Sequence, residues 1–201
     1  MRRGSIAGAR AGVGVPDPSP EEFSRALFSV VDLLESLGAP HLIFGAVAVG
    51  IWGRIRATLD VDFLVQTDED GLSRLGAAAE SAGLAVDQQW LDWNPLRRGV
   101  HLRLLLEPFR ADVVRTIGAH DDAALERRRQ VSWRGRSLWV VSPEDLILQK
   151  IRAQRDYDFS DAVSIVEEQA GRLDEGYLDV WARRLGVEQE LAYILRGGPA
   201  G

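Results

Sequence analysis

The feature that most constrains the fold is a change in the hydrophobic pattern at Ser142. Between residues 40 and 141, short apolar runs typical of strands alternate with helical segments, and several runs are separated by hairpin-length turns. From Ser142 onward, apolar residues recur at helical spacing. Hairpins mixed with helices argue against an all-parallel doubly wound sheet. We therefore expect an α/β (α+β) half with a mixed sheet flanked by helices, followed by a helical region.

The length of 201 residues is enough for one domain with a small appendage. Residues 1–18, rich in Gly, Ala and Pro, are expected to form a flexible tail. Residues 19–141 then form the α/β domain, and residues 142–201 form the C-terminal helical region that completes the site. The longest apolar run, 42–52, is too short to span a bilayer, and no signal-peptide pattern is present. We therefore expect a cytoplasmic protein without a membrane partner.

The positions of individual elements follow from the same patterns and from capping residues. Strands are predicted at 41–44, 59–66, 100–106 and 110–116, with a further hairpin over 131–141. Helices are predicted to begin at Ser19 and to cover 46–55, 70–82, 119–129, 143–156, 159–166, 174–186 and 187–196, and residues 90–99 are predicted to form a loop.

The composition excludes several kinds of chemistry. The chain has no cysteine, which rules out a disulfide framework, a thiolate zinc site and a cysteine nucleophile. No two of its three histidines have the spacing of metal ligands. With 24 basic and 30 acidic residues, the net charge of −6 argues against a protein surface that is basic overall and binds nucleic acid.

Two acidic residues occupy alternate positions in the predicted strand 59–66. Side chains two residues apart on a strand point to the same face, so Asp60 and Asp62 project together, while Val61 and Phe63 face the core. Two carboxylates on one face repel each other unless a cation lies between them. Mg²⁺ suits this position because it binds a few carboxylate oxygens and leaves positions open for phosphates.

Three further features surround this carboxylate pair. Gly45 lies between a predicted strand and a predicted helix, where backbone N–H groups can hold a phosphate. Arg56 and Thr58 lead into Asp60 and are candidates for contacts with a triphosphate. Asp112 is an isolated acid in another predicted strand, and it reaches the same metal if that strand lies alongside at about 5 Å.

These residues resemble a known superfamily. The stretch from Gly45 to Val65, together with Asp112, resembles the minimal nucleotidyltransferases of the polymerase-β superfamily. The segment 141–147, followed by Lys150, Arg155, Asp158 and Asp161, is similar to the AbiEii-like nucleotidyltransferases of abortive-infection and toxin–antitoxin systems. The resemblance covers residues 42–168.

The resemblance implies transfer of a nucleoside monophosphate from a Mg-bound nucleoside triphosphate (NTP) to an acceptor, with pyrophosphate leaving. It implies two Mg²⁺ ions, with Asp60 and Asp62 as ligands of both and Asp112 as a ligand of the second and as proton acceptor. Gly45 and Ala46 would hold phosphate, although members of the family usually carry Gly-Gly or Gly-Ser there. Ala46 lacks the serine hydroxyl, so a degenerate enzyme kept as a binding protein is an alternative.

Lys150 is the single lysine of the chain. It shares a helical face with apolar residues, and the resemblance places it near the triphosphate. The alternatives are packing or a salt bridge with Asp145, Asp158 or Asp161. If Lys150 contacts phosphate, Lys150→Ala abolishes transfer and spares folding.

The sequence leaves the acceptor open. The similarity to toxin nucleotidyltransferases points to tRNA and a cognate toxin or antitoxin protein, whereas related scaffolds modify hydroxylated antibiotics such as aminoglycosides or lincosamides. A non-catalytic antitoxin or partner-binding module is the third reading. Three weaker signals each allow a structural interpretation. Trp90, Trp93 and Asn94 either cap the core or line an acceptor pocket. The cations of Arg127–Arg129, with Arg97 and Arg98, form either a solvated face or a contact surface for RNA phosphates, and His101 is expected to be structural.

Overall fold

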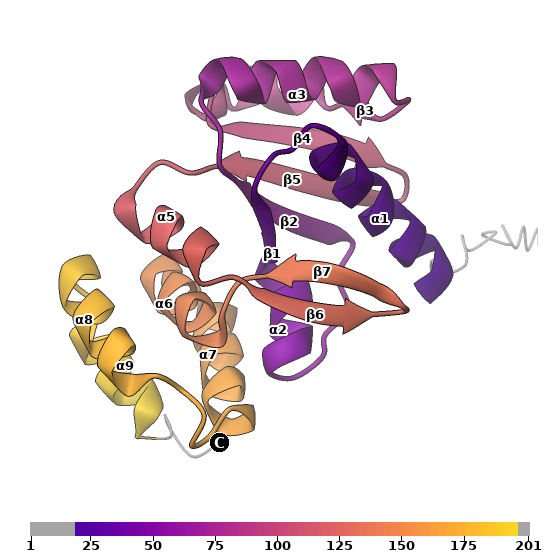
Figure 1. Ribbon diagram of the computed structural model, residues 1–201. Helices are drawn as coiled ribbons and strands as arrows, with labels where there is room; N and C mark the ends of the chain where they lie inside the picture. Colours follow the sequence, from indigo (N-terminus) through magenta and orange to yellow (C-terminus); the bar gives the residue numbers. More distant parts are fainter. Residues whose placement is uncertain (1–18, 197–201) are drawn as a thin grey trace, which may run out of the picture.

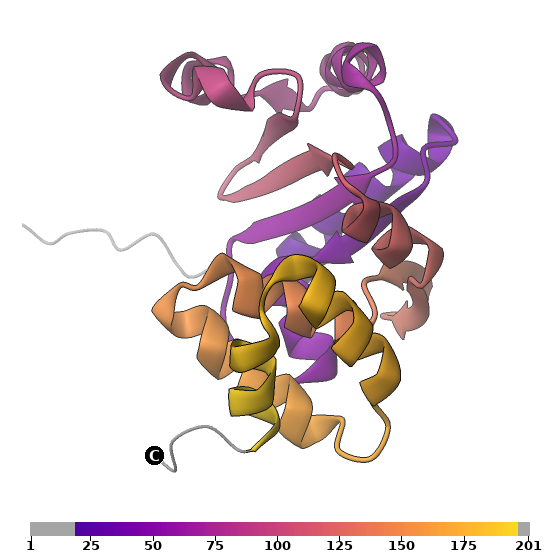
Figure 2. The same ribbon diagram turned by 90° about the vertical axis from the view of Figure 1, so that its left-hand side faces the viewer.

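The computed structural model describes residues 19–196, so the predicted tail 1–18 and residues 197–201 lie outside the described part. A mixed seven-stranded sheet forms the centre, in the order β3-β4-β5-β2-β1-β7-β6. The C-terminal helices gather at one side of the molecule, while α3 lies along the opposite edge of the sheet (Figures 1 and 2). No helix within residues 19–196 has the length and apolar character needed to cross a membrane.

The sheet combines antiparallel and parallel strand pairs. β2 is antiparallel to β1 and parallel to β5, and β5 is antiparallel to β4. β1 is parallel to β7, and β3 and β6 form the two edges through antiparallel pairs. The bounds are His41–Phe44 for β1, Asp60–Val65 for β2, Ala85–Val86 for β3, His101–Leu106 for β4, Phe109–Arg115 for β5, Arg129–Trp133 for β6 and Arg136–Val140 for β7.

The helices flank this sheet. Their bounds are Pro20–Ser36 for α1, Gly45–Trp52 for α2, Glu69–Ser81 for α3, Gln88–Trp93 for α4, Ala119–Glu126 for α5, Pro143–Ala153 for α6, Asp156–Glu168 for α7, Glu175–Leu185 for α8 and Glu188–Leu195 for α9, with a 3-10 turn, η1, at Pro95–Arg97. The predicted N-cap chemistry is confirmed: the side chains of Ser19 and Ser142 accept hydrogen bonds from the backbone N–H groups of Glu22 and Asp145.

The core lies on one face of the strands that carry the candidate site. Val61, Phe63 and Val65 of β2 are fully buried, as are Ala111 and Val113 of β5. Burial of large apolar side chains contributes about 1.5–3 kcal/mol each, which fixes the face that these strands turn inward. The intervening polar residues are therefore directed to the opposite face of the sheet.

The helical half is joined to the sheet through the end of α2. The indole Nε1 of Trp52 donates to the carbonyl oxygen of Val141 at 2.8 Å, and Gln169 Nε2 donates to the carbonyl of Trp52 at 2.8 Å. A side chain at Gly53 would meet the Ser164 hydroxyl oxygen at 2.5 Å, so the close approach of α7 requires glycine there.

Several predicted boundaries differ from the structure. The helix predicted at 46–55 ends at Trp52, because Gly53 leaves the helical conformation, with φ of −133° and ψ of −138°, and residues 53–59 return to β2 as an irregular segment. The predicted loop 90–99 holds the second half of α4 and the 3-10 turn η1. Asp87 caps α4 by accepting from the N–H of Trp90. α6 ends at Ala153 because Gln154 is left-handed, with φ of 54°. The short edge strand β3 carries no strong pattern and was not predicted.

Candidate active site

Three carboxylates lie on neighbouring strands of the sheet. Asp60 and Asp62 are on β2, and Asp62 is paired in register with Asp112 of the parallel strand β5. Adjacent strands are about 4.8 Å apart, so Asp112 lies beside Asp62 on the same face. The juxtaposition expected from the sequence is therefore present, whereas the chemical roles of these residues remain predictions.

These side chains line a cavity of about 650 Å³, which we call the carboxylate cavity. Strands β2, β4 and β5, the start of α2, and helices α6 and α7 contribute to its wall. The lining includes every residue predicted for the site: Gly45, Ala46, Arg56, Thr58, Asp60, Asp62, Asp112 and Lys150. The sheet half and the helical half of the chain thus contribute to one site.

Gly45 makes the tight turn from β1 into α2. Its φ of +66° lies in the left-handed region, and a Cβ there would come within 1.9 Å of Asp62 Oδ2. Both the backbone conformation and the space require glycine. Ala46, the next residue, is buried and also lines the carboxylate cavity. The turn therefore brings backbone directly against a carboxylate of the site.

Asp62 is the least favourably placed of the three acids. Burial, followed by repulsion from Asp112 and Asp60, raises the pKa of Asp62 to about 6, against an attraction from Lys150 and His101. A carboxyl group whose pKa rises for these reasons is one whose charge a cation would stabilise. This unbalanced negative charge is the main electrostatic feature of the site.

Asp112 is held by β4. The guanidinium of Arg103 donates to both carboxylate oxygens, at 2.7 Å from Nε and 2.9 Å from Nη2, and His101 Nε2 lies 3.0 Å from Oδ1. The ring of Trp90 lies 4.3 Å from the Arg103 Cζ atom and 4.5 Å from the His101 ring. Although burial alone would raise the pKa of Asp112, His101 and Arg103 outweigh it and lower this pKa to about 2.

The donor set determines how a metal ion would fit. Within residues 19–196, no three acidic or histidine side chains already converge as a metal site. Two of the three acids already have a cationic partner: Arg103 holds Asp112, and Arg110 Nε donates to Asp60 Oδ1 at 2.9 Å. Mg²⁺ at nucleotide sites is usually bound by one or two carboxylates together with substrate phosphates. The uncompensated charge at Asp62 therefore fits an ion that arrives with a nucleotide.

Lys150 lies in a buried ion cluster between α6 and α7. Its Nζ donates to Asp158 Oδ1 at 2.9 Å and to Asp161 Oδ2 at 2.8 Å, and its side chain is 8% exposed. Arg155 Nε donates to the other oxygen of Asp158 at 2.7 Å. The structure thus shows the salt bridge that was the alternative to a phosphate contact, and the phosphate contact remains a prediction.

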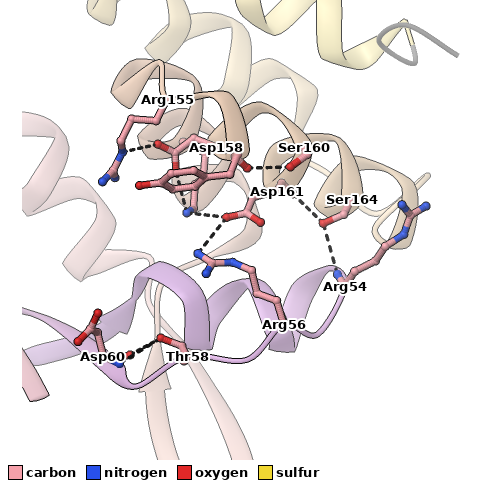
Figure 3. A network of polar contacts seen from close by, with 11 residues as sticks. Arg54, Arg56, Thr58, Asp60, Arg155, Asp158, Ser160, Asp161 and Ser164 are labelled. Atoms are coloured by element: carbon pink, nitrogen blue, oxygen red, sulfur yellow. Dashed lines mark hydrogen bonds and ion pairs between the residues drawn. The ribbon is translucent and has the colours of Figure 1, made fainter. Parts of the chain in front are cut away.

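Arg56 joins this cluster from the segment 53–59. Figure 3 shows Arg56 and Asp161 directed toward each other, at 3.4 Å, with Arg155 and Asp158 alongside. Thr58 uses its hydroxyl within the chain, accepting from the N–H of Asp60 at 3.1 Å. Thr58 therefore shapes the approach to β2, while the half-exposed Arg56 retains donors directed into the cavity.

The weaker sequence signals have mixed outcomes. Trp90 supports the Asp112 cluster, whereas Trp93 is 79% exposed and does not line the carboxylate cavity. The predicted basic run at 127–129 is not a free cationic face, because Arg127 lies 3.4 Å from Glu144 and Arg128 lies over the ring of Trp139. These contacts weaken the interpretation of the run as an RNA grip.

Arg103 was not predicted as a partner of Asp112, although the sequence contains a signal for this pairing. The two-residue connection Glu107–Pro108 between β4 and β5 sets the register in which Arg103 faces Asp112. A cation directly opposite an anion on adjacent strands is a stabilising pair. The contribution of Arg155 depends on the packing of α7, which no local pattern reports.

The sheet and its flanking helices define the nucleotidyltransferase fold, as predicted. The chain is similar to the solution structure of the antibiotic-resistance factor ANT(2'')-Ia, with a TM-score of 0.58 and 11% identity over 84% of this chain and 96% of that one. The crystal structure of ANT(2'')-Ia with adenylyl-2''-tobramycin gives a TM-score of 0.54 at 12% identity, covering 83% and 99% of the two chains.

An antigenic nucleotidyltransferase-like protein from Paracoccidioides brasiliensis has a TM-score of 0.51 at 16% identity, over 90% of this chain and 94% of that one. No family model matches the sequence, and no curated protein matches it significantly. At these identities the likeness establishes the fold, which is the mixed sheet flanked by helices that the sequence predicted.

Proposed function

We propose that this protein is a Mg-dependent nucleotidyltransferase that transfers a nucleoside monophosphate from an NTP to an acceptor hydroxyl. The observation that carries the proposal is the placement of Asp60, Asp62 and Asp112 on two adjacent strands, facing one cavity beside the Gly45 turn. An NTP fits this cavity because Arg56 and Arg155 line it together with the acids and can pair with phosphate oxygens.

In the proposed reaction, the acceptor oxygen forms a bond to the α-phosphorus, and the bond from that phosphorus to the pyrophosphate oxygen breaks. The hydroxyl proton passes to a carboxylate of the cluster. Asp60 and Asp62 would hold Mg²⁺, which when bound supplies charge neutralisation at the transferring phosphoryl group. Arg103 and His101 keep Asp112 ionised and fixed in orientation. The N–H groups that open α2 would hold the phosphates.

The test is release of pyrophosphate and transfer of label from each of the four α-labelled NTPs in the presence of Mg²⁺. We expect activity in the wild-type protein, loss of more than about 100-fold in Asp62→Ala, and no change in Asp70→Asn, which alters an exposed acid on α3. The absence of any transfer with every acceptor, combined with tight binding of a partner protein, would instead favour the degenerate binding module suggested by Ala46.

The acceptor and the biological setting belong to the same proposal. An AbiEii-like role, with tRNA as acceptor and a cognate toxin or antitoxin as partner, is motivated by the segment 141–161 alone. Modification of a small molecule is supported by the fold shared with ANT(2'')-Ia, whose structure contains adenylyl-2''-tobramycin. The ion pairs of Arg127 and the net charge of −6 favour the small-molecule acceptor over RNA.

A further inference from the structure

A second cavity lies next to the carboxylate cavity and is used by no step above. We call it the apolar cavity; its volume is about 770 Å³, within the range of small-molecule sites. The start of α1, one face of α2, the segment 55–59, the start of β5 and the β6–β7 turn form its wall. Its main apolar lining residues are Phe23, Val47, Ile55, Leu59, Phe109 and Trp133.

We propose that the apolar cavity binds the acceptor, and that the acceptor is a small aromatic or aliphatic molecule with a hydroxyl group and no net positive charge. This inference rests on the proposed nucleotidyltransferase function, because it names the substrate class of that reaction. It differs from both tRNA and the polycationic aminoglycosides, which were among the acceptors considered from the sequence.

The apolar lining indicates the body of the ligand. Phe109 contacts Phe23 edge to face, with ring centroids 5.4 Å apart, and Trp133 lies 6.3 Å from Phe23. Ile55 is 86% exposed and Leu59 is 42% exposed, although both are large apolar residues at the rim of the cavity. An occupant would cover them, and burial of such a side chain is favourable by about 1.5–3 kcal/mol.

The charges of the lining exclude a polycation. Arg56 and Arg134 are the charged residues that line this cavity in the described part of the chain, and no carboxylate does. Each guanidinium is already paired with one acid outside the cavity, Arg134 with Glu21 at 3.0 Å and Arg56 with Asp161 at 3.4 Å. A multiply charged amine would find no anionic partner here, whereas a neutral or singly negative molecule meets no repulsion.

The shared wall connects this cavity to the chemistry. Ala46, Arg56 and Thr58 line both cavities, and the Thr58 hydroxyl contacts the backbone of Asp60. A hydroxyl on the occupant therefore enters next to the residues that lead into the carboxylates. Its oxygen forms the bond to the α-phosphorus of the NTP, pyrophosphate leaves, and the proton passes to the acidic cluster, as in the proposed reaction.

Binding is tested with 1-anilinonaphthalene-8-sulfonate, an aromatic anion whose fluorescence rises on burial. We expect saturable binding to the full chain, competed by 2-naphthol, and at least tenfold weaker in Ala57→Trp, which fills the cavity from its exposed rim. Ile55→Ser, at a position too exposed to affect folding, should weaken binding several-fold. Ala119→Trp, an exposed position on α5, is the matched control and should bind as the wild type does.

Transfer is tested with α-labelled NTP, Mg²⁺ and one of 2-naphthol, tobramycin or total tRNA. We expect label on 2-naphthol, with its KM raised at least tenfold in Ala57→Trp and the KM for NTP unchanged.

Label on tobramycin or tRNA alone would overturn the inference while leaving the proposed function standing. Equal probe binding in wild type and Ala57→Trp would also overturn it, as would probe binding that appears only after residues 1–18 are removed, because the chain itself would then be the occupant. Pyrophosphate release without a labelled acceptor would overturn the acceptor class, and absence of release with every NTP would reject the nucleotidyltransferase itself.

Discussion

Gly45 links a backbone requirement to the chemistry of the site. Its positive φ is a conformational cost for any other residue, and the position of Asp62 Oδ2 leaves no volume for a Cβ. Gly38 provides a natural comparison, since its φ is +63° but no atom lies within 4 Å of its would-be Cβ. The two glycines therefore separate the strain of the backbone from the clash with the carboxylate.

We predict that Gly45→Ala destabilises the protein by about 3 kcal/mol or more and abolishes binding of Mg-NTP, because Asp62 or α2 must move. Gly38→Ala should cost about 1–2 kcal/mol from backbone strain and leave nucleotide binding unchanged. Urea denaturation and calorimetric titration measure the two quantities. Equal losses of stability in the two variants would contradict the assigned clash.

Asp62 carries an electrostatic cost in the folded protein. Because its pKa is raised to about 6, the folded state binds this proton more tightly than the unfolded chain does. Its contribution to the free energy of unfolding is therefore greatest below pH 4 and declines as pH rises through the interval from about 4 to 6. Above pH 6 the native state carries the buried charge at full cost.

In metal-free buffer with chelator, we predict that Asp62→Asn raises the free energy of unfolding by about 1–3 kcal/mol at pH 7, with little difference at pH 4. Asp70→Asn, on the exposed first turn of α3, should change it by no more than about 0.5 kcal/mol at either pH. Urea denaturation at the two pH values is the measurement. A loss of stability in Asp62→Asn at pH 7 would show that the carboxylates do not repel as described.

Lys150 shows what the sequence left undecided at the scale of single residues. Its helical face and its candidate partners Asp158 and Asp161 follow from the sequence. Whether the ammonium reaches them depends on the angle at which α7 meets α6, and that angle is set by the left-handed residue Gln154 and by packing. By contrast, the pairing of Asp112 with Arg103 follows from a two-residue hairpin and was open to prediction.

At the scale of elements, α6 and α7 are held together by this buried charge cluster. Lys150 is the buried cation that pairs with both Asp158 and Asp161. Without it, these buried carboxylates would keep only the more exposed Arg155 and Arg56 as partners, and a buried charge that loses its main partner is strongly destabilising. The sequence-based expectation that Lys150→Ala spares folding therefore changes.

We now predict that Lys150→Ala lowers the free energy of unfolding by about 3–5 kcal/mol. Arg183→Ala, which removes an exposed cation from the last turn of α8, should cost less than about 1 kcal/mol. In the triple variant in which Asp158→Asn and Asp161→Asn accompany Lys150→Ala, much of the stability should return, because no buried charge is left unpaired. Chemical denaturation checks all three, and unchanged stability of Lys150→Ala would refute the role of the cluster.

The success of element prediction depended on how much of each signal was local. Strand β2 and helices α3 and α8 were found within one or two residues, because they combine strong periodicity with capping residues. The end of α2 was missed because residues 53–55 leave the helix to let Gly53 contact α7, a tertiary event. Strand β3 has two residues and exists only through its pairing with β4.

At the scale of the whole molecule, the carboxylate cavity lies between two parts of the chain that are far apart in sequence. β2 and β5 provide the acids, and α6 and α7 provide Lys150 and Arg155. Trp52 and Arg54 connect the parts through contacts with Gln169 and Glu167. A nucleotide in this cavity would touch both parts at once, so its binding energy would stabilise their association.

We predict that Mg²⁺ with α,β-methylene-ATP, which cannot release pyrophosphate, slows amide hydrogen exchange in both 44–66 and 146–158. At a ligand concentration of about 100 times Kd, the gain in stability is about 2.7 kcal/mol, and exchange through global unfolding should slow accordingly. Chelator, or the variant Asp62→Ala, should abolish the effect, and α9 at 188–195 should show only the global component. If exchange slows specifically in 44–66, while in 146–158 it slows no more than it does in α9, the helices do not contribute to the nucleotide site.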